Sequence, residues 1–227
     1  MQAVILAAGK GTRMRPLTYD IPKPMLLVKG KPILEYTLAA LPEEIDEIIF
    51  IVNYLGEHIQ EHFGMEYKGK KIHYVLQENL NGTAGAVHSC KHLIKDGFLV
   101  INGDDLYRKE DIKNMLDNGL SVLAYEIENP QRFGVLKVDE KGNLVDIIEN
   151  KTSMPGWHLI NTGTYKLNKK FFDYPMVPIS ETEFGLPQTM MQMAKEFPIK
   201  IVKTDTWLPI GFPEDIKKAE EVIDKFI

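Results

Sequence analysis

Cysteine and long apolar runs are scarce in this sequence, and each scarcity excludes a class of protein. The 227 residues include one cysteine, Cys90, so no disulfide can form within the chain and a reducing compartment is expected. We interpret Cys90 as a small buried apolar residue rather than a nucleophile. No apolar run approaches the ~20 residues that span a bilayer, and the first one stops at Gly9 and Lys10. These features predict a cytoplasmic protein without membrane contact.

Positive charge is in deficit as well. The formal net charge is -5 at pH 7, which gives the chain no long-range attraction to nucleic acid or to anionic lipid. Only four arginines occur, and two of them, Arg13 and Arg15, lie in the loop that follows the first apolar run. Arginine binds phosphate through a planar set of N–H donors, so the position of these residues is more informative than their number.

Short apolar runs that are typical of buried strands alternate with helical patterns in the first half of the chain. Strands are predicted at 3–7, 47–52, 72–77 and 98–103, and helices at 33–41 and 84–93. This alternation favours right-handed β-α-β units and a sheet covered on both faces. After about residue 119 the strands follow one another closely, with a hairpin turn at 139–143 and an amphipathic helix at 213–227. We therefore expect an α/β fold whose mixed, mostly parallel sheet gains antiparallel strands in the second half.

The loop after the first strand carries the strongest functional signal. The stretch AVILAAGKGTRMRPLTYDIPKPMLLV fills positions 3–28. It fails the Walker pattern, which needs a lysine directly after its last glycine, and its prolines exclude the immediate helix of a dinucleotide-binding turn. Gly9 and Gly11 can still turn their backbone N–H groups toward an anion, while Arg13 and the proline-flanked Lys23 add positive charge. The loop is therefore predicted to bind phosphate.

At these residues the chain closely resembles a known family. The segments LAAGKGTRMRPLT and PKPMLLVKGKPIL resemble the signature of sugar-1-phosphate nucleotidylyltransferases, also called nucleotide-sugar pyrophosphorylases. The resemblance continues in order through LQENLNGTAGAV, VINGDDLY, RFGVLKV, IIENK, LINTGTY and WLPIGFPEDIKKA, which span nearly the whole chain. It implies a Rossmann-like, three-layer nucleotide-diphospho-sugar transferase fold. It also implies a Mg²⁺-dependent reaction in which an NTP and a sugar 1-phosphate give an NDP-sugar and pyrophosphate.

The resemblance assigns roles in nucleotide binding and catalysis to particular residues. Arg13, Lys23 and Asp104 match the catalytic positions, and Asp104 also matches the metal-binding aspartate. The positions that match nucleotide-binding residues are Leu6, Ala7, Ala8, Gly9, Gly11, Thr12, Gln77, Gly82 and Thr83. Within this set, Gln77 and Gly82 match the pair that reads the base. One domain, 1–227, is implied, with 1–119 as the NTP-binding half and 120–227 as the sugar-phosphate-binding half.

The sugar side is matched less completely. Gly134, Glu149, Asn161 and Thr162 match the family's sugar-binding positions. Many relatives read Glu-Lys-Pro where this chain reads Glu149-Asn150-Lys151, so Lys151 is the one candidate there for a cation on the sugar phosphate. A similar Glu-x-Lys in N-acetylglucosamine-1-phosphate uridylyltransferases favours UTP, or dTTP, and an amino or N-acetyl sugar.

A second departure concerns the metal. Relatives carry Asp or Asn two residues before the glycine of the final motif, where this chain has Pro209. Mg²⁺ keeps several waters and can rely on one carboxylate together with substrate phosphates, so we expect Asp104 to suffice. Asp205 is a weaker candidate for a second ligand. Asp105 is predicted to be a cap or turn residue.

Other readings of the same sequence remain open. A related enzyme could act on a non-sugar phosphate, as a choline-phosphate cytidylyltransferase does, although Glu149 and Asn161 favour a sugar. Pro209 leaves room for a catalytically impaired binding or regulatory protein. A homo-oligomer is also expected, because members of this family often form dimers or tetramers.

Overall fold

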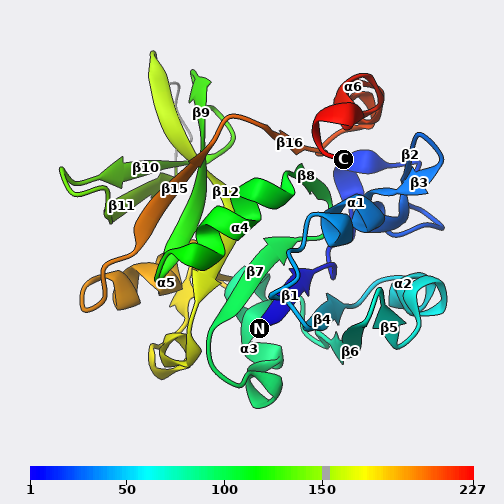
Figure 1. Cartoon of the computed structure of the whole chain (residues 1–227), viewed down its shortest axis with the longest axis horizontal. Coiled ribbons are helices and arrows are strands. Elements are labelled where there is room, and N and C mark those ends of the chain that lie inside the picture. Colours follow the sequence, from blue (N-terminus) through cyan, green and yellow to red (C-terminus); the bar gives the residue numbers. More distant parts are fainter. Residues whose placement is uncertain (150–153) are drawn as a thin grey trace.

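A computed structural model describes residues 1–149 and 154–227, and one mixed sheet runs through it (Figure 1). Within the described residues the sheet has ten strands, in the order β11-β10-β12-β7-β1-β4-β6-β5, with β9 and β15 attached through β12. The predicted α/β class and the mixed sheet are confirmed. The parallel pairings lie among β1, β4, β6 and β7 and between β9 and β15, while the other pairings in this sheet are antiparallel.

The first half of the chain builds the parallel part of the sheet. β1 (Gln2–Leu6) lies at its centre, between β4 (Glu47–Val52) and β7 (Phe98–Asn102), and β6 (Lys70–Leu76) follows β4. The apolar residues of β1, β4 and β7 are almost all buried on both faces, as expected for parallel strands between helices, whereas β6 fully buries only Ile72. Because all four strands run in the same direction, their carboxyl ends share one edge, which is where ligands bind in open α/β sheets.

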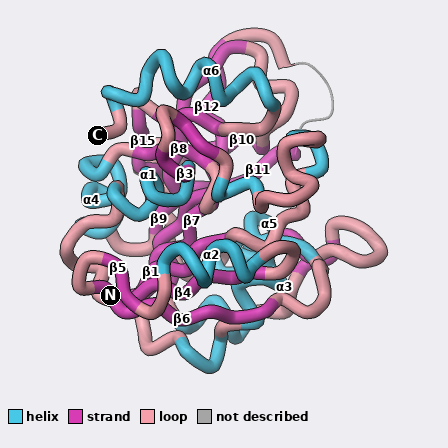
Figure 2. The backbone as a smooth tube through the Cα atoms, turned by 90° about the vertical axis from the view of Figure 1, so that its right-hand side faces the viewer, coloured by secondary structure: helices cyan, strands magenta, loops and turns pink. Residues whose placement is uncertain are grey.

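Helices cover both faces of the sheet and make three layers (Figure 2). Ile5 faces the layer formed by α1 (Ile33–Ala39), α2 (Gly56–Phe63) and α4 (Lys109–Asp117). Val4, one residue earlier, faces α3 (Gly82–Ser89) and α5 (Leu186–Ala194). Adjacent residues of a strand point to opposite faces, so one apolar run serves two cores. None of the described helices is long and apolar enough to cross a membrane.

The second half adds strands around the long β12 (Trp157–Leu167). β9 (Ser121–Glu128) pairs along one edge of β12, and β15 (Lys200–Thr204) pairs with β9. The opposite edge of β12 is shared: Ile160 pairs with Val135 of β10, and Tyr165 pairs with Val100 of β7. A register shift between Asn161 and Tyr165 separates the two pairings. The partners β10 (Gly134–Val138) and β11 (Leu144–Glu149) form a hairpin, as predicted.

Shorter elements complete the chain. They are β2 (Leu27–Val28), β3 (Lys31–Pro32), β5 (Glu66–Tyr67), β8 (Asp105–Tyr107), β13 (Val177–Pro178), β14 (Phe184–Gly185), β16 (Trp207–Pro209) and α6 (Pro213–Val222). A third apolar cluster joins Met14 of the opening loop, Ile33 of α1 and Ala219 of α6. This cluster fixes the opening loop against the last helix of the chain.

Candidate active site

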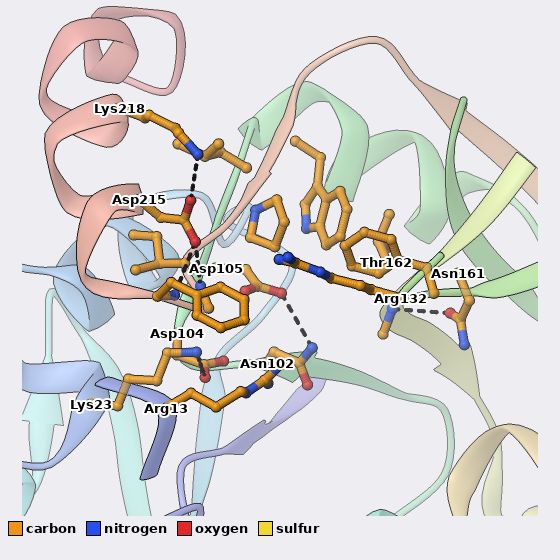
Figure 3. A pocket seen from close by; sticks show the side chains of 18 of the residues that line it. Arg13, Lys23, Asn102, Asp104, Asp105, Arg132, Asn161, Thr162, Asp215 and Lys218 are labelled. Carbon is orange, nitrogen blue, oxygen red and sulfur yellow. Dashed lines mark hydrogen bonds and ion pairs between the residues drawn. The ribbon is translucent and has the colours of Figure 1, made fainter. Parts of the chain in front are cut away.

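Three adjoining cavities open at the carboxyl edge of the parallel strands, and Asp104 borders all of them. Figure 3 shows the first of the three from close by. Their volumes are about 530, 210 and 600 Å³. We name them the sugar-side, loop and base-side cavities. Lys23 borders the first two, and Gly9 borders the last two. One carboxylate therefore faces a continuous groove that extends from the base-side to the sugar-side cavity.

The opening loop forms the wall of the loop cavity. Leu6, Ala7, Gly9, Gly11 and Thr12 line it, and Ala8 lines the base-side cavity. Within the described part of the chain, no acceptor is bonded to the backbone N–H groups of residues 9–13. Gly11 has φ of +58°, and a side chain there would lie 3.1 Å from Lys23 Cβ. The turn therefore depends on glycine and leaves a run of N–H donors for an anion.

Lys23 and Asp104 meet at the junction of the cavities. Lys23 Nζ donates to Asp104 Oδ2 over 2.5 Å, and the two side chains are 12% and 28% exposed. Asp104 lies in the tight turn between β7 and β8, which is held to β1 because Gly103 N–H donates to Leu6 O. The turn and the ion pair bring together two charges that are 81 residues apart in the chain.

The base-side cavity contains the residues predicted to read the base. Gln77 is buried, and its Nε2 donates to Gly82 O and to Asn81 Oδ1, both over 3.1 Å. Its Oε1 therefore remains the atom that can accept from a ligand. Thr83 also borders this cavity, although its hydroxyl accepts from Leu186 N–H.

The sugar-side cavity lies where β10 and β7 diverge from β12. Gly134 opens β10, while Asn161 and Thr162 lie at the register shift of β12, and all three border the cavity. Asn161 Nδ2 donates to Tyr165 Oη over 2.6 Å, and its Oδ1 accepts from Gly163 N–H. Thr162 is buried, and its hydroxyl donates to Leu123 O. The hydroxyl of Thr162 is therefore used within the sheet, whereas Asn161 offers its side-chain amide to the cavity.

Glu149 ends β11 and pairs with Gly134, but it is not among the residues that line the three cavities. Its Oε1 accepts from Gln188 Nε2, and a side chain added at Gly134 would lie 3.3 Å from the same oxygen. Because Gly134 has no side chain, the carboxylate of Glu149 can lie close to β10. Lys151, predicted to hold the sugar phosphate, lies outside the described residues.

The prediction that Asp105 caps a helix or turn is wrong. Asp105 is the first residue of β8, is buried, and accepts from Asn102 Nδ2 and Tyr107 Oη, both over 3.3 Å. The chain resumes as a strand directly after Asp104, which points the next side chain inward. Burial, with the nearby charge of Asp104, raises the pKa of Asp105 to about 7.

Pro209 lies at the cavity, as its place in the motif predicts. It belongs to β16, pairs with Asp105 of β8, and borders the sugar-side cavity, but it offers no side-chain oxygen. Asp205 is 81% exposed and pairs with Arg108 over 3.3 Å. It is absent from the lining of the three cavities, so it is badly placed as a second metal ligand. No group of three or more His, Cys, Asp or Glu side chains among the described residues could hold a metal ion.

Six further charged or aromatic residues that were not predicted border the sugar-side cavity. They are Arg132, Phe133, Trp207, Phe212, Asp215 and Lys218. Asp215 Oδ2 accepts from the N–H groups of Gly211 and Phe212, and its other oxygen accepts from Lys218 Nζ. Arg132 precedes β10 in the motif RFGVLKV, in which only Gly134 is a predicted site residue.

Comparison with known proteins identifies the family of the chain. A family model described as nucleotidyl transferase matches residues 2–225. The chain belongs to this family. Two of its relatives are named as a glucose-1-phosphate uridylyltransferase and a heptose 1-phosphate guanylyltransferase. It is 38% identical over 229 residues to the bifunctional protein GlmU of Methanocaldococcus jannaschii, covering 99% of this chain and 55% of that protein. The chain thus spans about half the length of this GlmU protein.

Two other relatives match over nearly their full length. The chain is 32% identical to the UTP–glucose-1-phosphate uridylyltransferase AglF of Haloferax volcanii, covering 97% of this chain and 96% of that one. Among solved structures, HddC from Yersinia pseudotuberculosis complexed with GMP-PN is 31% identical, with a TM-score of 0.73 and coverage of 98% and 99%. A UDP-glucose pyrophosphorylase complexed with UDP-glucose has a TM-score of 0.84 at 22% identity, which supports the fold alone.

Proposed function

We propose that this chain is a nucleotidylyltransferase that joins an NTP to a sugar 1-phosphate and releases pyrophosphate. In this reaction a phosphate oxygen of the sugar bonds to the α-phosphorus of the NTP while the bond to the departing pyrophosphate breaks. Attacker and target are both anions, so catalysis must come from alignment and charge neutralisation. The observation that carries the proposal is the groove itself, in which free N–H donors, Lys23, Asp104 and an uncharged sugar-side amide adjoin one another.

Each part of the groove has a task in this scheme. The N–H groups of residues 9–13 and Arg13 would hold the β- and γ-phosphates as pyrophosphate forms. Lys23 would leave Asp104 in part to bridge the α-phosphate and the sugar phosphate. Asn161 and Glu149 would bind hydroxyls of the sugar. The first half of the chain, 1–119, would thus bind the NTP, and the second half, 120–227, the sugar phosphate.

Asp104 would hold the Mg²⁺ on which the proposed reaction depends. A carboxylate beside a phosphate-binding turn is the oxygen ligand that this ion prefers, and one or two carboxylates suffice when substrate phosphates and waters complete the shell. The position of Asp104 at the meeting point of the cavities fits that use. When bound, Mg²⁺ would supply positive charge near the triphosphate.

The base-side cavity favours UTP or dTTP. The Nε2 of Gln77 is engaged by Gly82 O and Asn81 Oδ1, so Oε1 is left as an acceptor for a base. Uracil and thymine present a donor at N3, whereas cytosine and adenine present an acceptor at the corresponding edge. Guanine also presents a donor, at N1, and the HddC structure holds a guanine nucleotide. GTP is therefore the second choice.

One observation favours a different function. Pro209 borders the cavity where an oxygen ligand is expected, which suits a nucleotide-binding regulatory protein with weak turnover. A pyrophosphate-release assay separates the two functions, with UTP, dTTP, GTP, CTP and ATP tested against glucose 1-phosphate and N-acetylglucosamine 1-phosphate. We expect Mg²⁺-dependent turnover with UTP or dTTP. Tight NTP binding without turnover for any pair would instead favour the regulatory protein.

A further inference from the structure

The sugar-side cavity contains two guanidinium groups that share one aromatic ring. Arg13 Cζ lies 5.4 Å from the centre of the Phe212 ring, and Arg132 Cζ lies 4.6 Å from the same centre. Arg13 comes from the opening loop and Arg132 from the segment before β10, so they belong to different halves of the chain. Figure 3 shows them reaching toward the same part of the cavity from different sides.

Among the residues that the structure describes, neither guanidinium is neutralised by a carboxylate. Within residues 1–149 and 154–227, no carboxylate forms an ion pair with Arg13 or Arg132. The other cations of the cavity are paired, Lys23 with Asp104 and Lys218 with Asp215. Outside it, Arg108 pairs with Asp111 and Asp205. Two unpaired positive charges at one cavity indicate a site for two anions.

We propose that Arg132 binds the phosphate of the sugar 1-phosphate and that Phe212 positions it, an inference that rests on the proposed function. Arg13 adjoins the free N–H donors of the opening loop, which assigns it to the NTP. Arg132 lies two residues before Gly134, on the side of the cavity that carries Asn161. The second anion of the reaction is the sugar phosphate, and Arg132 is the described unpaired cation on that side.

The stacking on Phe212 is compatible with this role. A guanidinium over an aromatic face keeps the N–H groups at its edge, so it remains able to donate to phosphate oxygens. The ring also limits the conformations of a long side chain that is otherwise exposed, which lowers the entropy lost when the ligand binds. Arg132 thereby supplies the charge that Asn150 cannot, and does so from the segment before β10.

Steady-state kinetics with Arg132→Ala tests the inference, using the substrate pair that the panel assay identifies. The KM for the sugar 1-phosphate should rise ~10–100-fold, as expected when a charge-assisted hydrogen bond is lost, while the KM for the NTP changes less than about threefold. Lys137→Ala removes a positive charge from the exposed end of β10 and should change neither value. Equal changes in both KM values, or a change for the NTP alone, would overturn the assignment.

Conservative variants separate binding from positioning. Arg132→Lys keeps the charge but loses the planar donors, so its KM for the sugar 1-phosphate should lie between those of the wild type and Arg132→Ala. Phe212→Leu should raise the same KM by a smaller factor, and Phe212→Tyr should restore it. A Phe212→Leu variant with wild-type kinetics would show that the ring does not position Arg132.

Calorimetry keeps the inference testable if the wild type does not turn over. α-D-Glucose 1-phosphate and UTP would be titrated separately into the wild type, Arg132→Ala and Lys137→Ala. Absent turnover would refute the proposed function, yet selective loss of glucose 1-phosphate binding in Arg132→Ala would still support the assigned role. Glucose 1-phosphate binding that is unchanged in Arg132→Ala, or absent in the wild type, would refute the assignment.

Discussion

Gly82 offers the sharpest test of how the base-side cavity is built. Its φ is +89°, and a Cβ added there would lie 2.4 Å from Phe184 O and 2.7 Å from Phe184 N. Gly142, in the β10–β11 hairpin, has a similar φ of +75° but nothing within 4 Å of such a Cβ. Placing alanine at either positive φ therefore costs about 1 kcal/mol in backbone conformation. Only at Gly82 does a steric clash add to this cost.

The steric clash at Gly82 and its absence at Gly142 set the expected losses of stability. Moving rigid backbone away from an added methyl group costs about 2 kcal/mol, so Gly82→Ala should destabilise the protein by about 3 kcal/mol and Gly142→Ala by about 1 kcal/mol. The entropy that alanine removes from the unfolded chain is the same in both and cancels. Because Glu183, which borders the cavity beside Phe184, must move, Gly82→Ala should also weaken UTP binding.

Urea unfolding of both variants and the wild type measures the free energies, and calorimetric titration with UTP measures the affinities. Equal destabilisation by the two substitutions would refute the steric argument. Unchanged UTP affinity in a destabilised Gly82→Ala would show that the segment around Phe184 does not shape the nucleotide site.

Three further predictions concern single side chains. Asp104→Asn should lower kcat by ~10²–10³-fold in the pyrophosphate-release assay, with circular dichroism unchanged; near-wild-type turnover would exclude Asp104 from the chemistry. Pro209→Asp should reduce the Mg²⁺ concentration needed for half-maximal turnover, whereas an unchanged requirement would mean that this position does not reach the metal. Burial raises the pKa of the Cys90 thiol to about 12, so a thiol reagent at pH 8 should leave the folded protein unmodified and label one thiol in urea; rapid labelling of the native protein would contradict this burial.

The sequence predicts best what short segments determine by themselves. The strand at 3–7 is set by an unbroken apolar run, and the turn after it by Gly11, whose φ of +58° would strain a residue with a side chain. Lys23 and Asp104 were recognised because each lies inside a motif. That they form an ion pair could not be read from the sequence, since it depends on how the loop folds back over the sheet edge.

The errors and omissions arise where distant segments meet. The sequence predicts a cap at Asp105 because polar residues after a strand usually begin a turn, but Asp105 pairs with Pro209 of β16 and its side chain is buried. Arg132 was missed because nothing in its own segment distinguishes it from an exposed arginine. Its significance comes from Phe212, 80 residues later, and no local pattern contains that contact.

The shared edge of β12 has a mechanical consequence. One strand carries β7 of the first half beside β10 of the second half, with β9 along its other edge. Strands of both halves are thus hydrogen-bonded to the same eleven residues. We therefore expect any motion that closes the groove to proceed by twisting of one continuous sheet rather than by a hinge between two halves.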